Sequence, residues 1–211
     1  FKNKVMTEWE SIKDSALLLT DDEITRCKSF FSDPDYESLA DNPDSLSNRL
    51  QNDIIFSSWH TQNVKPHKIP GYAIATVCFK ETGVAPGDVT DRQLNYLAQL
   101  ADEYSFGEVR VSHQQNIVFA DVRQDKLYDF WLGLQSESMS SRNLGLLTDM
   151  ICCPGGDFCA LANAKSIPIA ESIQREFSDY DDLLEIGEIN LNISGCMNAC
   201  GHHHVGNIGI L

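Results

Sequence analysis

Five of the seven cysteines of this chain crowd between residues 152 and 200, and four of them form two spaced pairs. Cys153 and Cys159 are separated by five residues in "CPGGDFC", and Cys196 and Cys200 are separated by three residues in "CMNAC". Thiolates in two such pairs can hold either a zinc ion or an iron–sulfur cluster. We therefore expect a metal centre assembled from both pairs, with buried free cysteines as the alternative.

The spacing of the first pair favours a cluster over zinc. Structural zinc sites usually place about two to four residues between paired ligands, whereas a cubane cluster is larger than one ion and accepts wider spacing. Glycines flank both pairs, and they can bring backbone N–H groups close to sulfur. We expect Cys159 to open a helix whose positive end favours an anionic cluster. Cys152 is the spare thiol, because adjacent residues do not easily face one cluster.

The segment before the first pair predicts a ferredoxin-like half domain over residues 66–135. Residues 71–79 form a predicted strand, residues 90–105 a helix, residues 108–112 and 116–122 two strands, and residues 125–134 a second helix. Thr90 and Gln93 have the spacing of a capping box, and the predicted apolar stripe of the first helix contains Leu94, Leu97, Ala98 and Ala101. The order β-α-β-β-α predicts an α+β fold.

The remaining residues form the flanks of this half domain. Residues 1–65 are polar and predict a linker or helical arm, with one helix near Asp21–Phe31 after Thr20. Residues 136–211 predict a partial α/β domain that holds the cofactors. Its expected elements are a strand over 145–153, helical pieces over 159–166 and 167–177, and a strand over 188–194. Because the chain begins at Phe1, we expect a piece of a longer protein.

The charge and hydropathy of the chain exclude some partners. The net charge of −15 argues against nucleic acid, which needs a basic surface. No apolar run is long enough to span a membrane, so we expect a cytoplasmic protein. The acidity suits solubility, or docking to a protein with a basic face.

The residues "CCPGGDFCALANAKSIPIAESIQ" and "LNISGCMNACGHHHVGNIGIL" resemble the C-terminal half of the siroheme-containing sulfite and nitrite reductases, specifically the hemoprotein (β) component of assimilatory sulfite reductase. The resemblance extends over about residues 64–211. It implies that Cys153, Cys159, Cys196 and Cys200 ligate a [4Fe–4S] cluster and that Cys200 also bridges to the siroheme iron.

The resemblance also implies further cofactor-binding residues. Asn198 matches an asparagine of the family motif, and a group on the predicted strand–turn–strand lies in the segment that faces siroheme, namely Arg110, Ser112, Gln115 and Asn116. The alternative for these four is a turn that satisfies its own hydrogen bonds. For the run from His202 to His204 the choices are metal ligation, hydrogen bonding that supports the cofactors, or packing.

The implied function is the six-electron reduction of sulfite to sulfide at siroheme coupled to the cluster. Nitrite reduction to ammonia is the alternative, and a non-catalytic module that holds a metal with four cysteines is a second alternative. The implied partners are the N-terminal half of the same protein and an electron donor, either a flavoprotein subunit or ferredoxin. Since the N-terminal half and the end of the C-terminal domain are expected to be missing, we expect this chain alone to be inactive.

Overall fold

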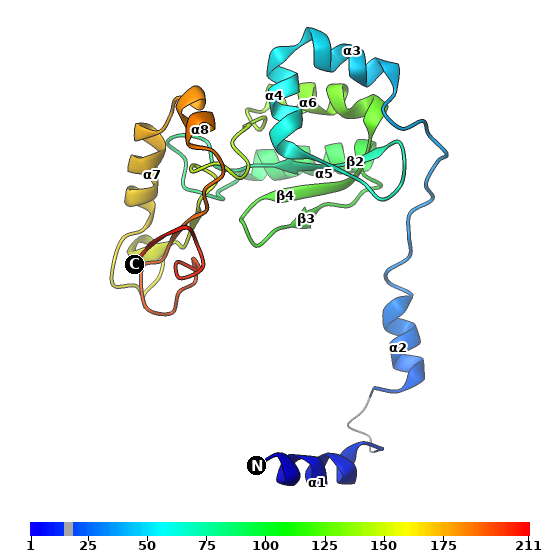
Figure 1. Cartoon of the computed structure of the whole chain (residues 1–211), viewed down its shortest axis with the longest axis vertical. Coiled ribbons are helices and arrows are strands. Elements are labelled where there is room, and N and C mark those ends of the chain that lie inside the picture. The colour runs from blue at the N-terminus through cyan, green and yellow to red at the C-terminus, as the bar shows by residue number, and fades with distance from the viewer. Residues whose placement is uncertain (15–18) are drawn as a thin grey trace. The chain divides into compact units, whose positions relative to one another are not determined.

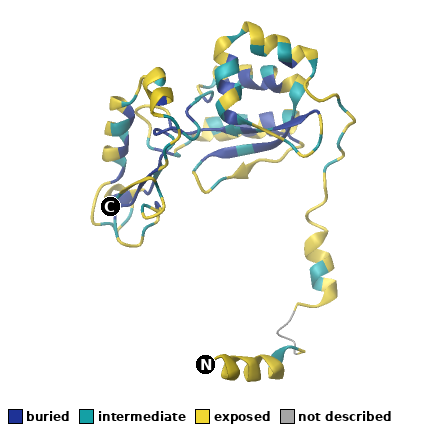
Figure 2. Ribbon diagram, in the orientation of Figure 1, coloured by how far each residue is buried: buried dark blue, intermediate teal, exposed yellow. Residues whose placement is uncertain are grey.

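The computed structural model describes residues 1–14 and 19–211, which form two compact units, Phe1–Glu37 and Ser38–Leu211. The first unit contains the helices α1 (Lys2–Ile12) and α2 (Asp21–Lys28). Figure 2 shows both helices mostly exposed, and neither buries a residue. The side chain of Thr20 accepts a hydrogen bond from the backbone N–H of Glu23, so the predicted start of α2 is confirmed.

The second unit begins much earlier than the predicted domain boundary between residues 65 and 66. Helices α3 (Asp44–Asn52) and α4 (Ile54–Asn63) belong to this unit. Phe56 and Trp59 are fully buried, and the ring of Phe56 lies 5.3 Å from that of Trp131. The prediction that residues 1–65 form one arm is therefore wrong, because the apolar face of α4 is part of the core.

The first sheet contains four antiparallel strands in the order β1-β2-β4-β3. They are β1 (Val64–Pro66), β2 (Tyr72–Val77), β3 (Arg110–Val111) and β4 (Ile117–Arg123). Helix α5 (Asp91–Tyr104) connects β2 to β3, and the 3-10 turn η1 (Gln124–Lys126) leads from β4 into α6 (Leu127–Ser136). Figure 1 shows α3, α4 and α6 together on one side of this sheet. The predicted α+β class and β-α-β-β-α order are confirmed.

The capping box of α5 is present, but its apolar stripe lies differently from the prediction. The side chain of Thr90 accepts from the backbone N–H of Gln93, and the side chain of Gln93 accepts from that of Thr90. Leu94 is 48% exposed. Leu97 and Ala101 of the predicted stripe are buried, and Leu100 is buried with them, because the sheet and α6 cover this face of α5. One apolar cluster joins α3–α6 to the sheet, with Phe119, Leu127, Phe130 and Leu134 at 0% exposure.

A second, parallel sheet has the order β5-β6-β7. Its strands are β5 (Ile151–Cys152), β6 (Leu191–Ile193) and β7 (Ile208–Ile210). Helices α7 (Ile167–Glu176) and α8 (Tyr180–Ile186) lie beside it in Figure 1 and share its apolar cluster. Of the predicted strand over 145–153, only the two residues of β5 are extended strand. Turns precede them, such as the turn in which the N–H of Asp149 donates to the carbonyl of Leu146.

In the segment after Cys153, the helix expected to begin at Cys159 is absent, whereas the expected position of Pro168 is confirmed. Cys159 does not open a helix; it follows the 3-10 turn η2 (Gly155–Asp157), and the next helix begins only at Ile167. The N–H groups of Asn163 and Ala164 both donate to the carbonyl of Gly195, which holds this segment against the end of β6 and prevents a helical turn. The helix-dipole argument at Cys159 therefore fails. Pro168 does lie in the first turn of α7, as its chemistry requires.

In the part of the chain that the structure describes, no helix is long and apolar enough to cross a membrane.

Candidate metal centre

The second sheet carries the two cysteine segments to the same place. Cys153 directly follows β5, and Ser194, Gly195 and Cys196 directly follow β6. Because β5 and β6 are parallel neighbours, their carboxyl ends lie at one edge of the sheet. The N–H of Cys153 donates to the carbonyl of Ile193 at an N···O distance of 3.0 Å. The backbones next to the two cysteine pairs are thus hydrogen-bonded to each other, although they lie far apart in the sequence.

A backbone N–H points at the sulfur of Cys153, as the glycine pattern predicts. The N–H of Gly195 donates to Sγ of Cys153 at 3.0 Å, and Oγ of Ser166 lies 3.4 Å from the same sulfur. Two other glycines use their N–H groups differently: Gly156 donates to the carbonyl of Ala164, and Gly201 donates to Oγ of Ser194. The prediction is confirmed for Gly195, whose N–H is of the kind that stabilises a thiolate ligand.

The position of Gly195 cannot hold a larger residue. A Cβ atom built there would lie 2.7 Å from the carbonyl oxygen of Ala164 and 3.0 Å from Cα of Gly155. The carbonyl of Gly195 also accepts the two N–H groups of Asn163 and Ala164. The loop after the first cysteine pair and the loop before the second are therefore packed against each other at this glycine.

The four paired thiols differ in exposure. Cys153 is buried, Cys159 and Cys196 are half-buried, and Cys200 is exposed. Among the described residues, no three His, Cys, Asp or Glu side chains converge closely enough to hold a single metal ion. The ligands of a cubane stand farther apart than those of one ion. A cluster held by the two pairs stays a prediction.

Cys152 points away from this edge and into the apolar cluster of the second sheet. Its thiol lies 3.3 Å from the carbonyl oxygen of Cys153, to which it donates. Burial, and to a smaller extent the neighbouring thiol of Cys153, raise the pKa of Cys152 to about 12. A thiol that stays protonated is a poor metal ligand, since metals bind the thiolate.

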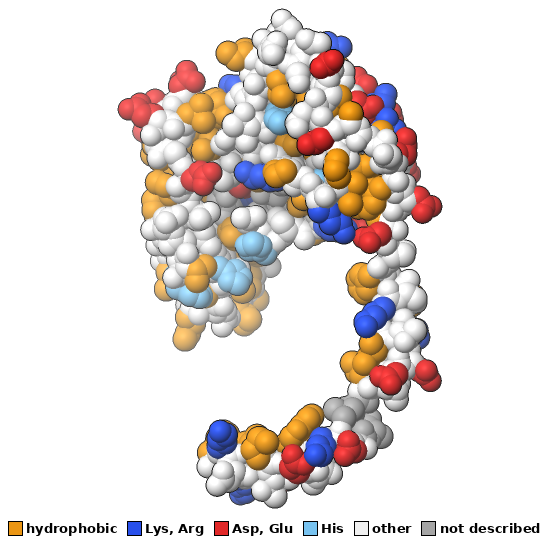
Figure 3. All heavy atoms as spheres, turned by 45° about the vertical axis from the view of Figure 1, so that its right-hand side comes forward, with side chains coloured by type: hydrophobic (Ala, Val, Ile, Leu, Met, Phe, Trp, Pro, Cys, Tyr) orange, Lys and Arg blue, Asp and Glu red, His pale blue; other side chains and the backbone are white. Residues whose placement is uncertain are grey.

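The histidines after Cys200 lie in a loop that ends at β7. Nδ1 of His203 is buried and has no hydrogen-bond partner among the described residues. The carbonyl of His202 accepts from the side chain of Asn192 at 3.1 Å. Histidine side chains gather near apolar side chains on the face shown in Figure 3.

Asn198 is exposed in the loop between the two cysteines of the second pair. Lys165 forms an ion pair with Asp157 at a distance of 2.8 Å.

The predicted cofactor-binding residues on β3 and in the β3–β4 turn are hydrogen-bonded within the protein. Oγ of Ser112 accepts from the backbone N–H of Asn116, and the buried side chain of Asn116 contacts Asp149 and Lys80. Arg110 is exposed and pairs with Glu108 at 2.7 Å. Of these contacts, only that between Ser112 and Asn116 lies within the strand–turn–strand itself, and a role of these four residues toward siroheme stays a prediction.

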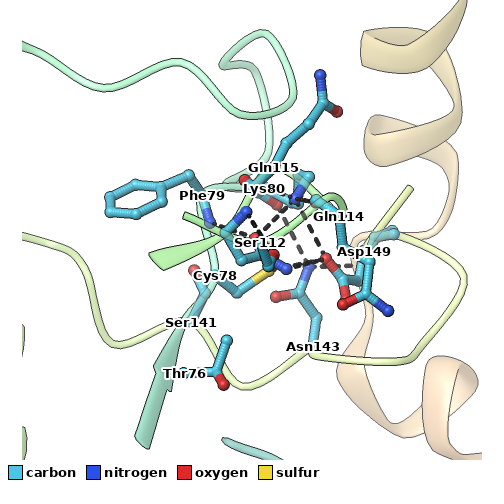
Figure 4. Close-up of polar contacts among 12 residues, drawn as sticks. Thr76, Cys78, Phe79, Lys80, Ser112, Gln114, Gln115, Ser141, Asn143 and Asp149 are labelled. Carbon is cyan, nitrogen blue, oxygen red and sulfur yellow. Dashed lines mark hydrogen bonds and ion pairs between the residues drawn. The ribbon is translucent and has the colours of Figure 1, made fainter. Parts of the chain in front are cut away.

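A buried ion pair that sequence reasoning missed lies next to this turn (Figure 4). Nζ of Lys80 is 3.2 Å from Oδ1 of Asp149, and their side chains are 0% and 4% exposed. Asn116 donates to the same carboxylate oxygen at 2.9 Å, and the N–H of Gly145 donates to the other oxygen at 2.9 Å. Nothing in the sequence separates Lys80 from a surface lysine, because its partner is 69 residues away.

Cys78 also belongs to this group of residues. Its thiol donates to Oδ1 of Asp149 at 3.3 Å. Burial, followed by the negative charge of Asp149, raises the pKa of Cys78 well above its usual value. Cys78 is therefore a protonated hydrogen-bond donor inside the protein and lies outside the paired cysteines.

A polar hollow of about 340 Å³ joins the β3–β4 turn to the loop after Cys200. Its lining includes His113 and Asp149 on one side and Asn192, His202 and Val205 on the other. The β3–β4 turn and the loop after Cys200 thus line the same hollow.

Comparison with known proteins agrees with this architecture. Residues 81–136 match the family model described as the nitrite/sulfite reductase ferredoxin-like half domain. The ferredoxin–nitrite reductase of Zea mays chloroplasts is 27% identical over 79% of this chain and 29% of its own length. Sulfite reductase [ferredoxin] 2 of Mycolicibacterium paratuberculosis is 29% identical over 61% of this chain and 24% of its own length. The chain thus spans less than a third of either relative.

The structure of the NirA protein of Mycobacterium tuberculosis has the same fold over 67% of this chain and 25% of its own chain, with a TM-score of 0.50 and 24% identity. The fold is therefore a ferredoxin-like half domain followed by a parallel-sheet module with paired cysteines. In sequence, the chain is similar to nitrite and sulfite reductases, and residues 81–136 match the half domain of these enzymes.

Proposed function

We propose that this chain is the cluster-bearing part of a siroheme-dependent reductase that converts sulfite to sulfide, with nitrite reduction as the alternative activity. The observation that carries the proposal is the contact between the two cysteine segments, in which the N–H of Gly195 donates to Sγ of Cys153. Through this contact the segments that carry the two pairs meet at one edge of the second sheet. Family relatives named for either reaction support both substrates.

The residues have distinct roles in this proposal. Cys153, Cys159, Cys196 and Cys200 hold the [4Fe–4S] cluster, and Gly195 orients the sulfur of Cys153. When bound, the cluster and siroheme would supply single electrons for the reduction. Cys200 is the thiol proposed to join the two, and it is the exposed member of the four. Its exposure leaves room for a second cofactor on that side.

The electron donor follows from the family and the charge. Relatives named for their use of ferredoxin support ferredoxin as the donor, and a flavoprotein subunit is the alternative. With a net charge of −15, the chain suits a donor that presents a basic face. We keep the cytoplasm as the proposed compartment, although the maize relative is chloroplastic. We also propose that the chain alone does not turn over substrate.

Two measurements test the proposal. The intact protein that carries this chain should show the intense Soret band and the red band of siroheme, and it should oxidise a reduced dye faster with sulfite than with nitrite. The chain alone should show no such turnover. An intact protein without haem absorbance, and without turnover of either anion, contradicts the proposal. A colourless protein that binds zinc supports a structural module with four cysteine ligands instead.

A further inference from the structure

The side-chain amide of Gln115 occupies the open edge of strand β5. Oε1 of Gln115 accepts from the backbone N–H of Cys152 at 3.0 Å, and Nε2 donates to the carbonyl of Cys152 at 2.8 Å. In the order β5-β6-β7, β5 is an edge strand, with β6 on its other side. One glutamine thus satisfies the outward-facing donor and acceptor of Cys152, as a neighbouring strand would.

Gln115 is presented to β5 by a turn that Lys80 holds in place. Nζ of Lys80 donates to the carbonyl oxygens of Gln114 at 2.8 Å and of Gln115 at 3.1 Å. It also donates to Oδ1 of Asn116 at 2.6 Å. Figure 4 shows these bonds converging on the lysine, whose side chain is fully buried. The turn is therefore fixed from within by a cation that cannot reach solvent.

The backbone of Gln115 is strained. Its φ angle is +59°, in the left-handed region that non-glycine residues rarely adopt. Such a residue persists where its surroundings over-determine its conformation, and these positions cluster where the strain has a use. Gly87 packs against the same residue, since a Cβ there would lie 2.8 Å from Cβ of Gln115. Lys80, Gly87 and Cys152 together hold Gln115 in this conformation.

The pairing of Gln115 with Cys152 reaches Cys153 through one peptide bond. Cys153 donates its N–H to Ile193 in β6, and its sulfur accepts the N–H of Gly195. The chain at this point is therefore held from the ferredoxin-like half on one side and from β6 on the other. Releasing the first of these contacts leaves β5 bound along one edge only.

We propose that Gln115 is a positioning residue for the Cys153 thiol. By clamping the peptide of Cys152, it keeps the sulfur of Cys153 against the N–H of Gly195. The proposal rests on the proposed function only in that Cys153 is taken as a cluster ligand. It assigns to Gln115 a contact with the protein backbone, in place of the contact with siroheme that the family resemblance implies.

The test measures the alkylation of single thiols in the metal-free chain. Mass spectrometry follows the rate at which iodoacetamide modifies Cys153 in the wild type, Gln115→Ala and Gln115→Gly. Glycine tolerates the left-handed backbone, so that variant keeps the turn while losing the amide. We expect Cys153 to react about tenfold faster in both, the factor expected for the loss of two hydrogen bonds. Gln114→Ala, an exposed neighbour whose backbone carbonyl alone contacts Lys80, should react like the wild type.

Cys78 reports whether the whole unit opens, because it is buried on the other side of the turn. Faster alkylation at Cys153 with unchanged Cys78 supports positioning. An unchanged Cys153 in both Gln115 variants overturns it, as does an equal rise at Cys78. In chains reconstituted with iron and sulfide, the Gln115 variants should also shift the cluster's reduction potential. A wild type that assembles no cluster contradicts the proposed function, while the thiol rates still decide the role of Gln115.

Discussion

Lys80 and Asp149 form an ion pair that water does not reach, with Nζ and Oδ1 separated by 3.2 Å. The lysine follows β2 in the ferredoxin-like half, and the aspartate precedes β5 in the cysteine-bearing half. The pair therefore joins the two sheets of the larger unit. Oδ1 of Asp149 also accepts from Asn116 and from the thiol of Cys78, so three side chains depend on one carboxylate oxygen.

Replacing the cation of this pair should be strongly destabilising. Lys80→Met removes the charge but keeps most of the volume, which leaves the carboxylate of Asp149 buried and uncompensated. We expect the free energy of unfolding to fall by about 3–5 kcal/mol, measured by urea denaturation. Lys126→Met is the matched control, because its pair with Asp129 spans 3.9 Å and both side chains are about half exposed. It should change stability by less than about 0.5 kcal/mol. A loss below about 1 kcal/mol for Lys80→Met, within the range of an exposed pair, contradicts the buried network.

The buried thiols predict a loss of stability at alkaline pH. The pKa of Cys152 is raised from 9.0 to about 12 in the folded state, so the unfolded chain releases this proton first. The contribution is fully present below about pH 9 and is lost as the pH rises toward 12. The slope from this one thiol is at most about 1.4 kcal/mol per pH unit.

Cys152→Ala isolates this contribution, because the raised pKa values of Cys78 and Tyr104 act in the same direction in both proteins. Urea denaturation at pH 8 and pH 10.5 should show a smaller loss of stability for the variant than for the wild type. Equal losses in the two proteins would mean that the Cys152 thiol titrates alike in the folded and unfolded states.

The position of α4 in the core predicts which aromatic residues near the N-terminus matter for stability. Trp59 is fully buried, whereas Phe31 in the first unit is 85% exposed. Trp59→Ala should destabilise the larger unit by about 3–5 kcal/mol, while Phe31→Ala should stay within about 0.5 kcal/mol. Thermal denaturation followed by circular dichroism measures both. If Trp59→Ala and Phe31→Ala both changed stability only slightly, residues 1–65 would behave as one arm outside the core, which contradicts the placement of α4.

Local signals predicted the ferredoxin-like half well. Thr90 and Gln93 are three residues apart, so their capping box can be read from sequence alone. The buried face of α5 was harder, because Leu94 and Leu97 are equally apolar and only the packed sheet decides between them. Trp59 was missed for a related reason: it lies in a polar part of the sequence, and it packs against Phe130 of α6 far along the chain.

The cysteine pattern could be read from the sequence, but the contacts around it could not. The paired cysteines and the N–H of Gly195 follow from short motifs. Lys80, Asp149 and the clamp from Gln115 to Cys152 join residues at least 33 positions apart, which no local pattern shows. The helix expected at Cys159 failed because Asn163 and Ala164 give their N–H groups to Gly195, a long-range competitor for a local helical turn.

The most direct test of the central claim is the ligand set of the cluster. The chain and its single cysteine variants are reconstituted anaerobically with iron and sulfide, reduced, and examined by electron paramagnetic resonance. The wild type should show the signal of a reduced [4Fe–4S] cluster, and Cys27→Ser, which changes an exposed thiol outside the pairs, should retain it. Cys153→Ala and Cys196→Ala should lose most of the signal and of the bound iron. Full signal in both of these variants, or a wild type that takes up zinc and no cluster, would contradict the account.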